Sequence, residues 1–265
     1  MKIAVIGAAG RMGVAVIQET LKNSIFQLSA GYATLPTNEA NDLGEIANLR
    51  PIGIKASTDL SATIETAEII IDFSAPELSL QAINIAAAQQ KIFVSGTTGF
   101  NDAEFNQIEQ YAQQIPILWS ANMSIGVNLL HKLVTLTAQQ LDSDFATEIL
   151  EMHHQYKKDA PSGTALALGK TLAAAKNIDF NSSAKLSREG ICGERQKDEI
   201  GFATLRGGSV VGEHSVIFAA ENEIIELTHK AVNRNIFAHG ALQAAKWLYS
   251  NNKSAGLYSI ADLLN

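Results

Sequence analysis

The class of fold is indicated by the amino-terminal stretch Lys2-Ile3-Ala4-Val5-Ile6-Gly7-Ala8-Ala9-Gly10-Arg11-Met12-Gly13. Its apolar half is typical of a buried strand, and a Gly-x-x-Gly-x-x-Gly turn follows directly and opens a helical pattern that runs from Met12 to Leu21. Bare backbone at a helix amino terminus lets a diphosphate approach the positive end of the helix dipole, and Arg11 adds a cation. We interpret the stretch as a dinucleotide-binding turn; the alternative is a tight turn that binds nothing.

The same rhythm of apolar run and helical pattern continues to about residue 120. Runs of nearly continuous hydrophobicity are typical of parallel strands buried on both faces, and helices of this spacing are typical of crossover connections. We therefore expect an α/β domain with a doubly wound, Rossmann-type parallel sheet. The expected strands are Lys2 to Ile6, Phe26 to Ala30, Ile69 to Phe73, Ile92 to Ser95 and Ile117 to Trp119, with a weaker one at Ile52 to Ala56, and the expected helices after the first are Glu77 to Gln89 and Ala103 to Gln113.

After about Ser124 the pattern changes to that of a second, α+β domain built on an open mixed sheet. A helical pattern from Val127 to Leu141 precedes the alternating run Ala146 to His154, and the polar segment Asn177 to Glu199 has no clear period, so we expect a loop there. Later β-like runs cover Phe202 to Arg206, Ser209 to Phe218 and Ile224 to His229, and a last amphipathic pattern covers Phe237 to Tyr249. The last pattern could belong to either domain, and periodicity does not decide between them.

Composition excludes several classes of protein. Hydrophobic residues make up 46% and charged residues 18% of the 265 residues, which is typical of a globular chain. The net charge of −7 argues against a nucleic-acid or membrane partner, and no apolar run reaches the ~20 residues of a membrane span. The lone Cys192 excludes an intrachain disulfide and a cysteine-based zinc site, and it favours a cytoplasmic location.

Two small polar loops follow strands at the edge where the glycine turn lies. They are Gly96-Thr97-Thr98-Gly99 and Ser120-Ala121-Asn122-Met123, and ligands of open α/β sheets bind at this carboxyl edge. The second strand ends in Ala33-Thr34, without the acidic residue typical of NAD sites or the arginine typical of NADP sites. The choice between NADH and NADPH is therefore open, and Thr34 is a candidate contact for the adenosine end.

The stretch Glu151-Met152-His153-His154-Gln155-Tyr156-Lys157-Lys158-Asp159-Ala160-Pro161-Ser162-Gly163-Thr164 is the most informative for chemistry. It gathers imidazole and ammonium groups directly before a Ser-Gly-Thr that resembles the start of a helix. Hydroxyl groups, free backbone N–H groups and lysines together form an anion pocket beside a titratable imidazole. Adjacent histidines without a third ligand match no zinc pattern, so we expect no metal. A near P-loop around Gly169-Lys170-Thr171 has the wrong glycine spacing.

These motifs resemble the dihydrodipicolinate reductase family, now named for 4-hydroxy-tetrahydrodipicolinate, of bacterial lysine and diaminopimelate synthesis. The resemblance rests on the stretches quoted above, on Ser187 to Gly190 and on Gly212-Glu213-His214, and it spans nearly the whole chain. It implies hydride transfer from NADH or NADPH to a cyclic dicarboxylate imine, and a homotetramer assembled through the second domain's sheet. It also implies that 1–124 plus 235–265 form a dinucleotide-binding domain and that 125–234 form a substrate-binding and oligomerisation domain. A non-catalytic nucleotide-binding regulator with a Rossmann domain is the alternative from another class.

The resemblance also implies roles for single residues. His153 would donate or accept the proton, Lys157 would be a second proton donor, and His154, Gly163 and Thr164 would bind the substrate. The cofactor would contact Gly7, Ala8, Ala9, Gly10, Arg11, Met12, Thr34, Gly96, Thr97, Thr98, Ser120, Ala121, Asn122 and Met123. Two departures stand out: Ala33-Thr34 replaces the family's frequent charged pair, and Met123 stands where an aromatic residue is common.

Overall fold

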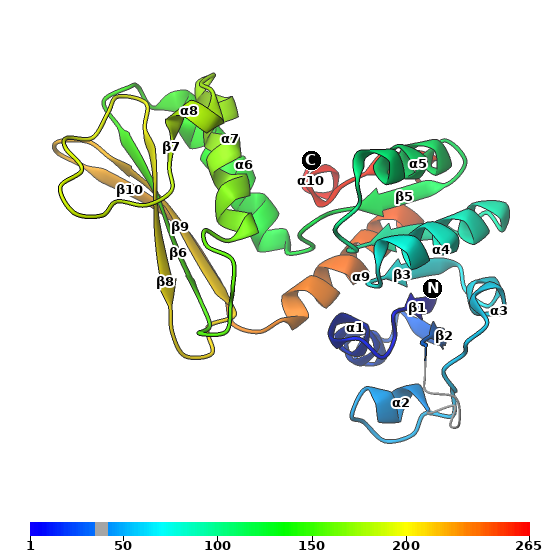
Figure 1. Ribbon diagram of the computed structural model, residues 1–265. Coiled ribbons are helices and arrows are strands. Elements are labelled where there is room, and N and C mark those ends of the chain that lie inside the picture. Colours follow the sequence, from blue (N-terminus) through cyan, green and yellow to red (C-terminus); the bar gives the residue numbers. More distant parts are fainter. Residues whose placement is uncertain (35–41) are drawn as a thin grey trace. The chain divides into compact units, whose positions relative to one another are not determined.

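Residues 1–34 and 42–265 are described by the computed structural model, and within these ranges the first sheet has six strands, all parallel. Their order is β11-β5-β4-β3-β1-β2, with neighbours paired in parallel register. This order confirms the parallel, doubly wound sheet that the apolar runs predicted (Figure 1). The strands are β1 (Lys2–Ile6), β2 (Gln27–Tyr32), β3 (Ile69–Asp72), β4 (Ile92–Ser95), β5 (Pro116–Trp119) and β11 (Gly256–Tyr258).

Helices cover both faces of this sheet because successive strand side chains point to opposite faces. In β1, Ile3 and Val5 belong to one core cluster with residues of α1 and α9, whereas Ala4 and Ile6 belong to a second cluster with residues of α3, α4 and α5. All four of these side chains are fully buried. The helices are α1 (Arg11–Leu21), α2 (Leu43–Ile46), α3 (Leu60–Glu65), α4 (Pro76–Ala88), α5 (Asp102–Ala112), α9 (Asn235–Ser250) and α10 (Ile260–Leu263).

The second sheet is mixed, as expected, with the order β10-β9-β6-β8-β7. Strand β6 pairs antiparallel with β9 and parallel with β8, so it occupies the centre of the sheet. Two long helices supply the rest of the core, where Val134 and Leu168 pack in one cluster with Ile149 and Val216. The elements are α6 (Ile125–Gln140), β6 (Ala146–His153), α7 (Gly163–Lys176), α8 (Phe180–Ser183), β7 (Ala184–Lys185), β8 (Ile200–Arg206), β9 (Gly212–Ala219) and β10 (Ile224–Ala231).

The chain divides into two units by its contacts. The first unit contains Met1–Ile125 and Arg234–Asn265, and the second contains Gly126–Asn233. Helix α9, which periodicity alone left unassigned, packs in the first unit against α1 and the sheet. The roles that we assigned to the two stretches of chain stay predictions.

Two expectations for secondary structure were wrong. The run Ile52 to Ala56 is not a strand of the sheet: Lys55 forms only an isolated bridge with Asp42, and Gly53 has a φ of +80° that interrupts extended backbone. The segment Asn177 to Glu199 is not entirely loop, because α8 and the short strand β7 lie within it. The carboxylate of Asp179 caps α8 by accepting a hydrogen bond from the Ser182 backbone.

Membrane-spanning helices and metal-binding clusters are both absent from the described residues. No helix there combines the length and the apolar character needed to cross a membrane. Within the same ranges, no group of three or more His, Cys, Asp or Glu side chains has an arrangement that would hold a metal ion.

Candidate active site

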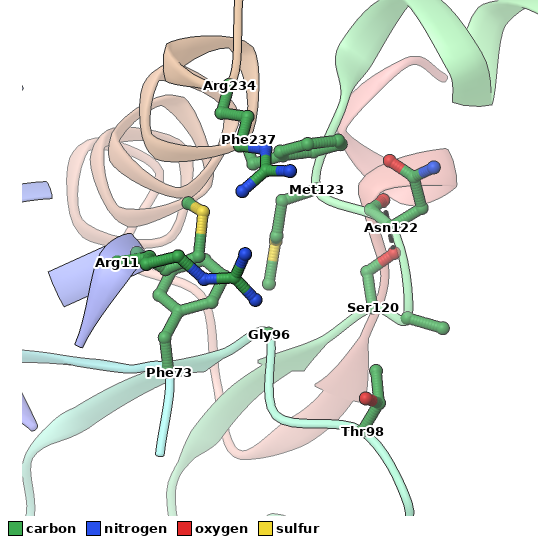
Figure 2. A pocket seen from close by; sticks show the side chains of 11 residues that line it. Arg11, Phe73, Gly96, Thr98, Ser120, Asn122, Met123, Arg234 and Phe237 are labelled. Atoms are coloured by element: carbon green, nitrogen blue, oxygen red, sulfur yellow. Dashed lines mark hydrogen bonds between the residues drawn. The ribbon is translucent and has the colours of Figure 1, made fainter. Parts of the chain in front are cut away.

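A pocket of about 310 Å³ opens at the carboxyl edge of the parallel sheet, in the first unit. Figure 2 shows the guanidinium groups of Arg11 and Arg234 directed into it, with the side chain of Met123 nearby. Neither arginine takes part in an ion pair with any residue that the structure describes. The pocket therefore combines two available cations with an apolar wall. It is lined by Arg11, Met12, Phe73, Gly96, Thr98, Ser120, Ala121, Asn122, Met123, Arg234 and Phe237.

The glycine turn joins β1 to α1, and its residues Gly7, Ala8, Ala9 and Gly10 are not among those that line the pocket. The backbone N–H groups of Gly7 and Ala8 donate to the carbonyl oxygen of Tyr32, at 3.1 and 2.9 Å, which ties the turn to the end of β2. A Cβ atom at Gly13 would clash with the carbonyl oxygen of Gly7, so only glycine lets α1 start this close to the strand. Helix α1 has no side-chain cap at Gly10, which leaves its first N–H groups without a capping side chain.

The loop after β4 is anchored by a buried carboxylate, that of Asp72 at the end of β3. Its Oδ2 atom accepts hydrogen bonds from the hydroxyls of Ser79, Ser95 and Thr97 at 2.6, 2.9 and 2.8 Å. Its Oδ1 atom accepts from the Ser74 hydroxyl at 2.5 Å and from the Ser74 backbone at 3.1 Å. Burial raises the pKa of Asp72, while these hydrogen bonds oppose the rise. The network fixes the two loops that carry Phe73 and Gly96 into the pocket.

The structure brings together most, but not all, of the cofactor contacts expected from the sequence. Thr97 is buried and its hydroxyl faces Asp72, not the pocket. Thr34 is exposed and does not line the pocket. Reasoning from sequence did not single out Phe73 or Phe237, although Phe73 ends an expected strand at the correct edge, which was a usable signal. The eight expected contacts that do line the pocket are Arg11, Met12, Gly96, Thr98, Ser120, Ala121, Asn122 and Met123.

The second unit gathers the imidazoles around another buried carboxylate, that of Glu151 in β6. The Nδ1 atom of His153 lies 2.5 Å from Glu151 Oε2, and the guanidinium of Arg206 donates to both carboxylate oxygens at 2.8 and 2.9 Å. Burial holds the pKa of His153 below its ordinary value, although the hydrogen bond to Glu151 pulls it upward. The net effect favours the neutral imidazole in the free protein.

Helix α7 begins at Gly163, as the Ser-Gly-Thr signal predicted, and Ser162 caps it. The Ser162 hydroxyl accepts a hydrogen bond from the Ala165 backbone at 3.2 Å and also lies 3.0 Å from His214 Nε2. The Ser162 hydroxyl and His214 Nε2 therefore share a hydrogen bond whose donor is set by the tautomer of the ring. Burial lowers the pKa of His214 to about 4, and the His153 and His214 rings meet edge to face at 5.1 Å.

Lys157 and His154 lie beyond the end of β6, in the loop that leads to α7. The Lys157 ammonium donates to Asp159 Oδ1 at 2.9 Å, and it is close enough to His153 to lower the pKa of that imidazole. The Nδ1 atom of His154 is buried without a hydrogen-bond partner among the described residues. Strand β6 ends at His153, so the two adjacent histidines are not held to opposite faces of a continuing strand.

Comparisons with known proteins cover the whole chain. The family model described as dihydrodipicolinate reductase, N-terminus, matches residues 1–123, and the one described as dihydrodipicolinate reductase, C-terminus, matches residues 126–264. The chain belongs to the dihydrodipicolinate reductase family. Its relatives include proteins named 4-hydroxy-tetrahydrodipicolinate reductase from Hahella chejuensis, 43% identical over 99% of this chain and 98% of that protein, and from Wolbachia pipientis wMel, 44% identical over 100% and 99%.

Solved structures confirm the fold of this dihydrodipicolinate reductase family member. A dipicolinate-bound dihydrodipicolinate reductase from Paenisporosarcina sp. TG-14 matches with a TM-score of 0.76 at 24% identity, over 98% of this chain and 97% of that one. A scyllo-inositol dehydrogenase from Lactobacillus casei, solved with NAD(H) and scyllo-inositol, matches with a TM-score of 0.60 at 14% identity over 97% and 90%. The second match shows that the two-unit architecture also occurs outside the reductase family.

Proposed function

We propose that this chain reduces 4-hydroxy-tetrahydrodipicolinate with hydride from NADH or NADPH, as a step of lysine and diaminopimelate synthesis. The observation that carries the proposal is the cluster of His153, His154 and Lys157 directly before the amino terminus of α7, in a chain of this family. A regulator that only bound nucleotide would have no use for titratable groups arranged around an anion-binding helix end.

The residues of the first-unit pocket fit a nicotinamide dinucleotide. Arg11 and the uncapped start of α1 supply positive charge and N–H donors for a diphosphate. Phe73, Met123 and Phe237 supply apolar surface for a flat ring. When bound, the dinucleotide would supply the hydride that the protein itself cannot provide. The choice between NADH and NADPH stays open because Ala33 is buried and Thr34 is uncharged.

The residues of the second unit would bind a dianion. The amino terminus of α7, at Gly163 and Thr164, would hold one carboxylate at the positive end of the helix dipole. Lys157 would exchange its present partner, the exposed carboxylate of Asp159, for the second carboxylate of the substrate. His154 lies next to this loop and would complete the substrate contacts.

His153 would supply the proton. In the free protein burial favours its neutral form, and the two negative charges of a bound substrate would favour the imidazolium. The protonated ring would then donate to the substrate as hydride arrives, which is a demand that an imidazole meets near neutral pH. Hydride and proton are both added to the ring of the substrate. The substrate must therefore contact both His153 and the nicotinamide during the reaction.

The test measures oxidation of NADH and of NADPH by the freshly formed cyclic substrate. The reaction is monitored by the loss of the near-ultraviolet absorbance of the reduced nicotinamide. We expect His153→Gln and Lys157→Ala each to lower turnover about 10²-fold or more with little change in dinucleotide affinity. The neighbouring exposed Lys158→Ala is the matched control and should retain turnover.

Two results would reject the proposal. Dinucleotide binding without oxidation in the wild-type protein would favour the regulator, and wild-type turnover in both His153→Gln and Lys157→Ala would remove these residues from the chemistry. A homotetramer and a cytoplasmic location also remain proposals. Exposed Leu205 and Ile224 on strands of the second sheet support an assembly through that sheet, and light scattering in solution would test it.

A further inference from the structure

Glu151 lies in the second unit at the centre of the group around His153, and its side chain is only 1% exposed. It stands two residues before His153 in β6, so the two side chains share one face of the strand. Strand β8 runs beside β6 and places Arg206 opposite His153, while β9 places His214 opposite Glu151. Three strands therefore bring their polar groups to one carboxylate.

The carboxylate of Glu151 is almost fully paired. It accepts from the Ser162 backbone N–H at 3.0 Å, from both terminal nitrogens of Arg206, and from the more distant Thr204 hydroxyl at 3.4 Å. Burial pushes the pKa of Glu151 upward, but the hydrogen bonds from Arg206, His153 and Ser162 hold it below its ordinary value. Glu151 is therefore ionised at neutral pH and can act only as an acceptor.

An ionised acceptor at Nδ1 dictates where His153 carries its proton. The distance of 2.5 Å between His153 Nδ1 and Glu151 Oε2 requires a proton on Nδ1, because two acceptors would repel each other. The other ring nitrogen, Nε2, is then left to gain or lose a proton. It lies beside Gly212, where a Cβ atom would come within 3.0 Å of it, so the absence of a side chain at this position keeps Nε2 uncovered from that direction.

We propose that Glu151 is a positioning residue that holds His153 in its Nδ1–H form and thereby reserves Nε2 for the proton exchanged with substrate. Arg206 keeps the carboxylate ionised, and Ser162 couples it to the anion-binding start of α7. The inference rests on the proposed role of His153 in proton transfer. No residue role of this kind follows from the sequence pattern, because Arg206 lies 55 residues beyond Glu151.

The charged and titratable groups that face His153 come from every neighbouring segment. They are Glu151 on its own strand, Arg206 on β8, the neutral His214 on β9, and Lys157 with its partner Asp159 in the following loop. Of these, Glu151 alone both contacts the ring and favours its protonated form. Removal of its charge should therefore shift the titration of His153 toward lower pH.

The first experiment tests the wild-type protein. ¹⁵N NMR of histidine-labelled protein distinguishes the two tautomers of a neutral imidazole, and the His153 signal is assigned as the one missing from His153→Gln. We expect the Nδ1–H tautomer in the wild-type protein at a pH above its titration. A wild-type His153 in the Nε2–H form would overturn the inference directly.

The second experiment uses Glu151→Gln, whose amide oxygen can still accept from Ser162 while its NH₂ group faces His153 Nδ1. We expect the tautomer to switch to Nε2–H, turnover to fall about 10- to 100-fold with unchanged dinucleotide affinity, and the alkaline limb of the pH profile to move to lower pH. The matched control is Glu148→Gln, which removes the same charge from β6 at a residue paired with Arg188, and it should change none of these readouts.

The outcomes separate this inference from the proposed function. A wild-type tautomer and pH profile in Glu151→Gln, together with lost turnover in His153→Gln, would overturn the role of Glu151 and leave the function intact. Wild-type turnover in His153→Gln would overturn the proposed function instead. If Glu151→Gln does not fold, the tautomer of the wild-type protein still decides the inference.

Discussion

The stability of the second unit should depend on pH through His214, whose ring is 4% exposed and hydrogen-bonded to the cap of α7. Burial lowers its pKa from 6.5 to about 4, with smaller lowering contributions from His153, His229 and Lys157 and an opposing one from Glu151. The folded protein therefore binds fewer protons than the unfolded chain between these two values. The linked stability is fully present above about pH 6.5 and is lost as the pH falls toward 4.

The magnitude follows from the shift. A decrease of about 2.5 pH units, at ~1.4 kcal/mol per unit, corresponds to about 3 kcal/mol when fully expressed. Between about pH 7 and pH 5 the same two pKa values give a loss of about 2 kcal/mol in the free energy of unfolding. The variant His214→Gln keeps a polar atom for Ser162 but does not titrate, so it should lack this part of the pH dependence.

The assay is amide hydrogen exchange of peptides from β6 and β9, read by mass spectrometry at fixed protein concentration. It reports on the second unit without the assumption that both units unfold together. Comparison of wild-type protein and His214→Gln at the same pH removes the pH dependence of intrinsic exchange. The stability difference between the two proteins should therefore change with pH. If it stays constant within about 0.5 kcal/mol from about pH 7 to pH 5, His214 does not carry this pH dependence.

Four further outcomes are expected. Gly13→Ala should weaken NADH binding at least about tenfold in a fluorescence titration, because its Cβ would clash with the carbonyl oxygen of Gly7. Asp72→Asn replaces an acceptor of several hydroxyl protons by a donor, so steady-state kinetics should show a higher dinucleotide KM with kcat changed much less. Thr34→Arg should lower the Kd for NADPH relative to NADH in calorimetric titrations, because it adds a cation where the ribose phosphate of NADP is bound in such folds. Added salt should raise the substrate KM of the wild-type protein, because it screens the attraction of Lys157 for a carboxylate.

Five strands of the parallel sheet could be predicted because they are largely buried and appear as apolar runs, whereas β11, which is not buried, was not predicted. The exceptions are segments whose structure depends on partners distant in sequence. Strand β7 pairs with β8 through Ala184 and Ile200, and nothing in its own two residues predicts a strand. Conversely, the apolar run that contains Gly53 forms only an isolated bridge with the described residues, between Lys55 and Asp42, so its composition predicted a strand that does not form there.

The candidate site was predictable where the chemistry is local and was missed where it is not. The residues from His153 to Thr164 lie on one continuous stretch, and the start of α7 at Gly163 follows from its Ser-Gly-Thr signal. The role of Glu151 could not be predicted from the sequence. In an alternating strand, a buried carboxylate cannot be distinguished from a solvated one until its partner is known. That partner, Arg206, is placed by the register of β6 with β8.

The two buried carboxylates explain how an acidic chain can offer sites to anions. Asp72 accepts hydrogen bonds only from hydroxyls and one backbone N–H, so its charge is not cancelled and burial raises its pKa. Glu151 is instead neutralised by the guanidinium of Arg206, and its pKa lies below the ordinary value. The positive charge that remains near His153 is that of Lys157, held only by the exposed Asp159. A protein with a net charge of −7 would by its total charge repel a dianion, and salt would then improve binding. Because Arg206 cancels the nearest negative charge and Lys157 can exchange the exposed Asp159 for a substrate carboxylate, the contact with the dianion is attractive, and salt should act in the opposite direction.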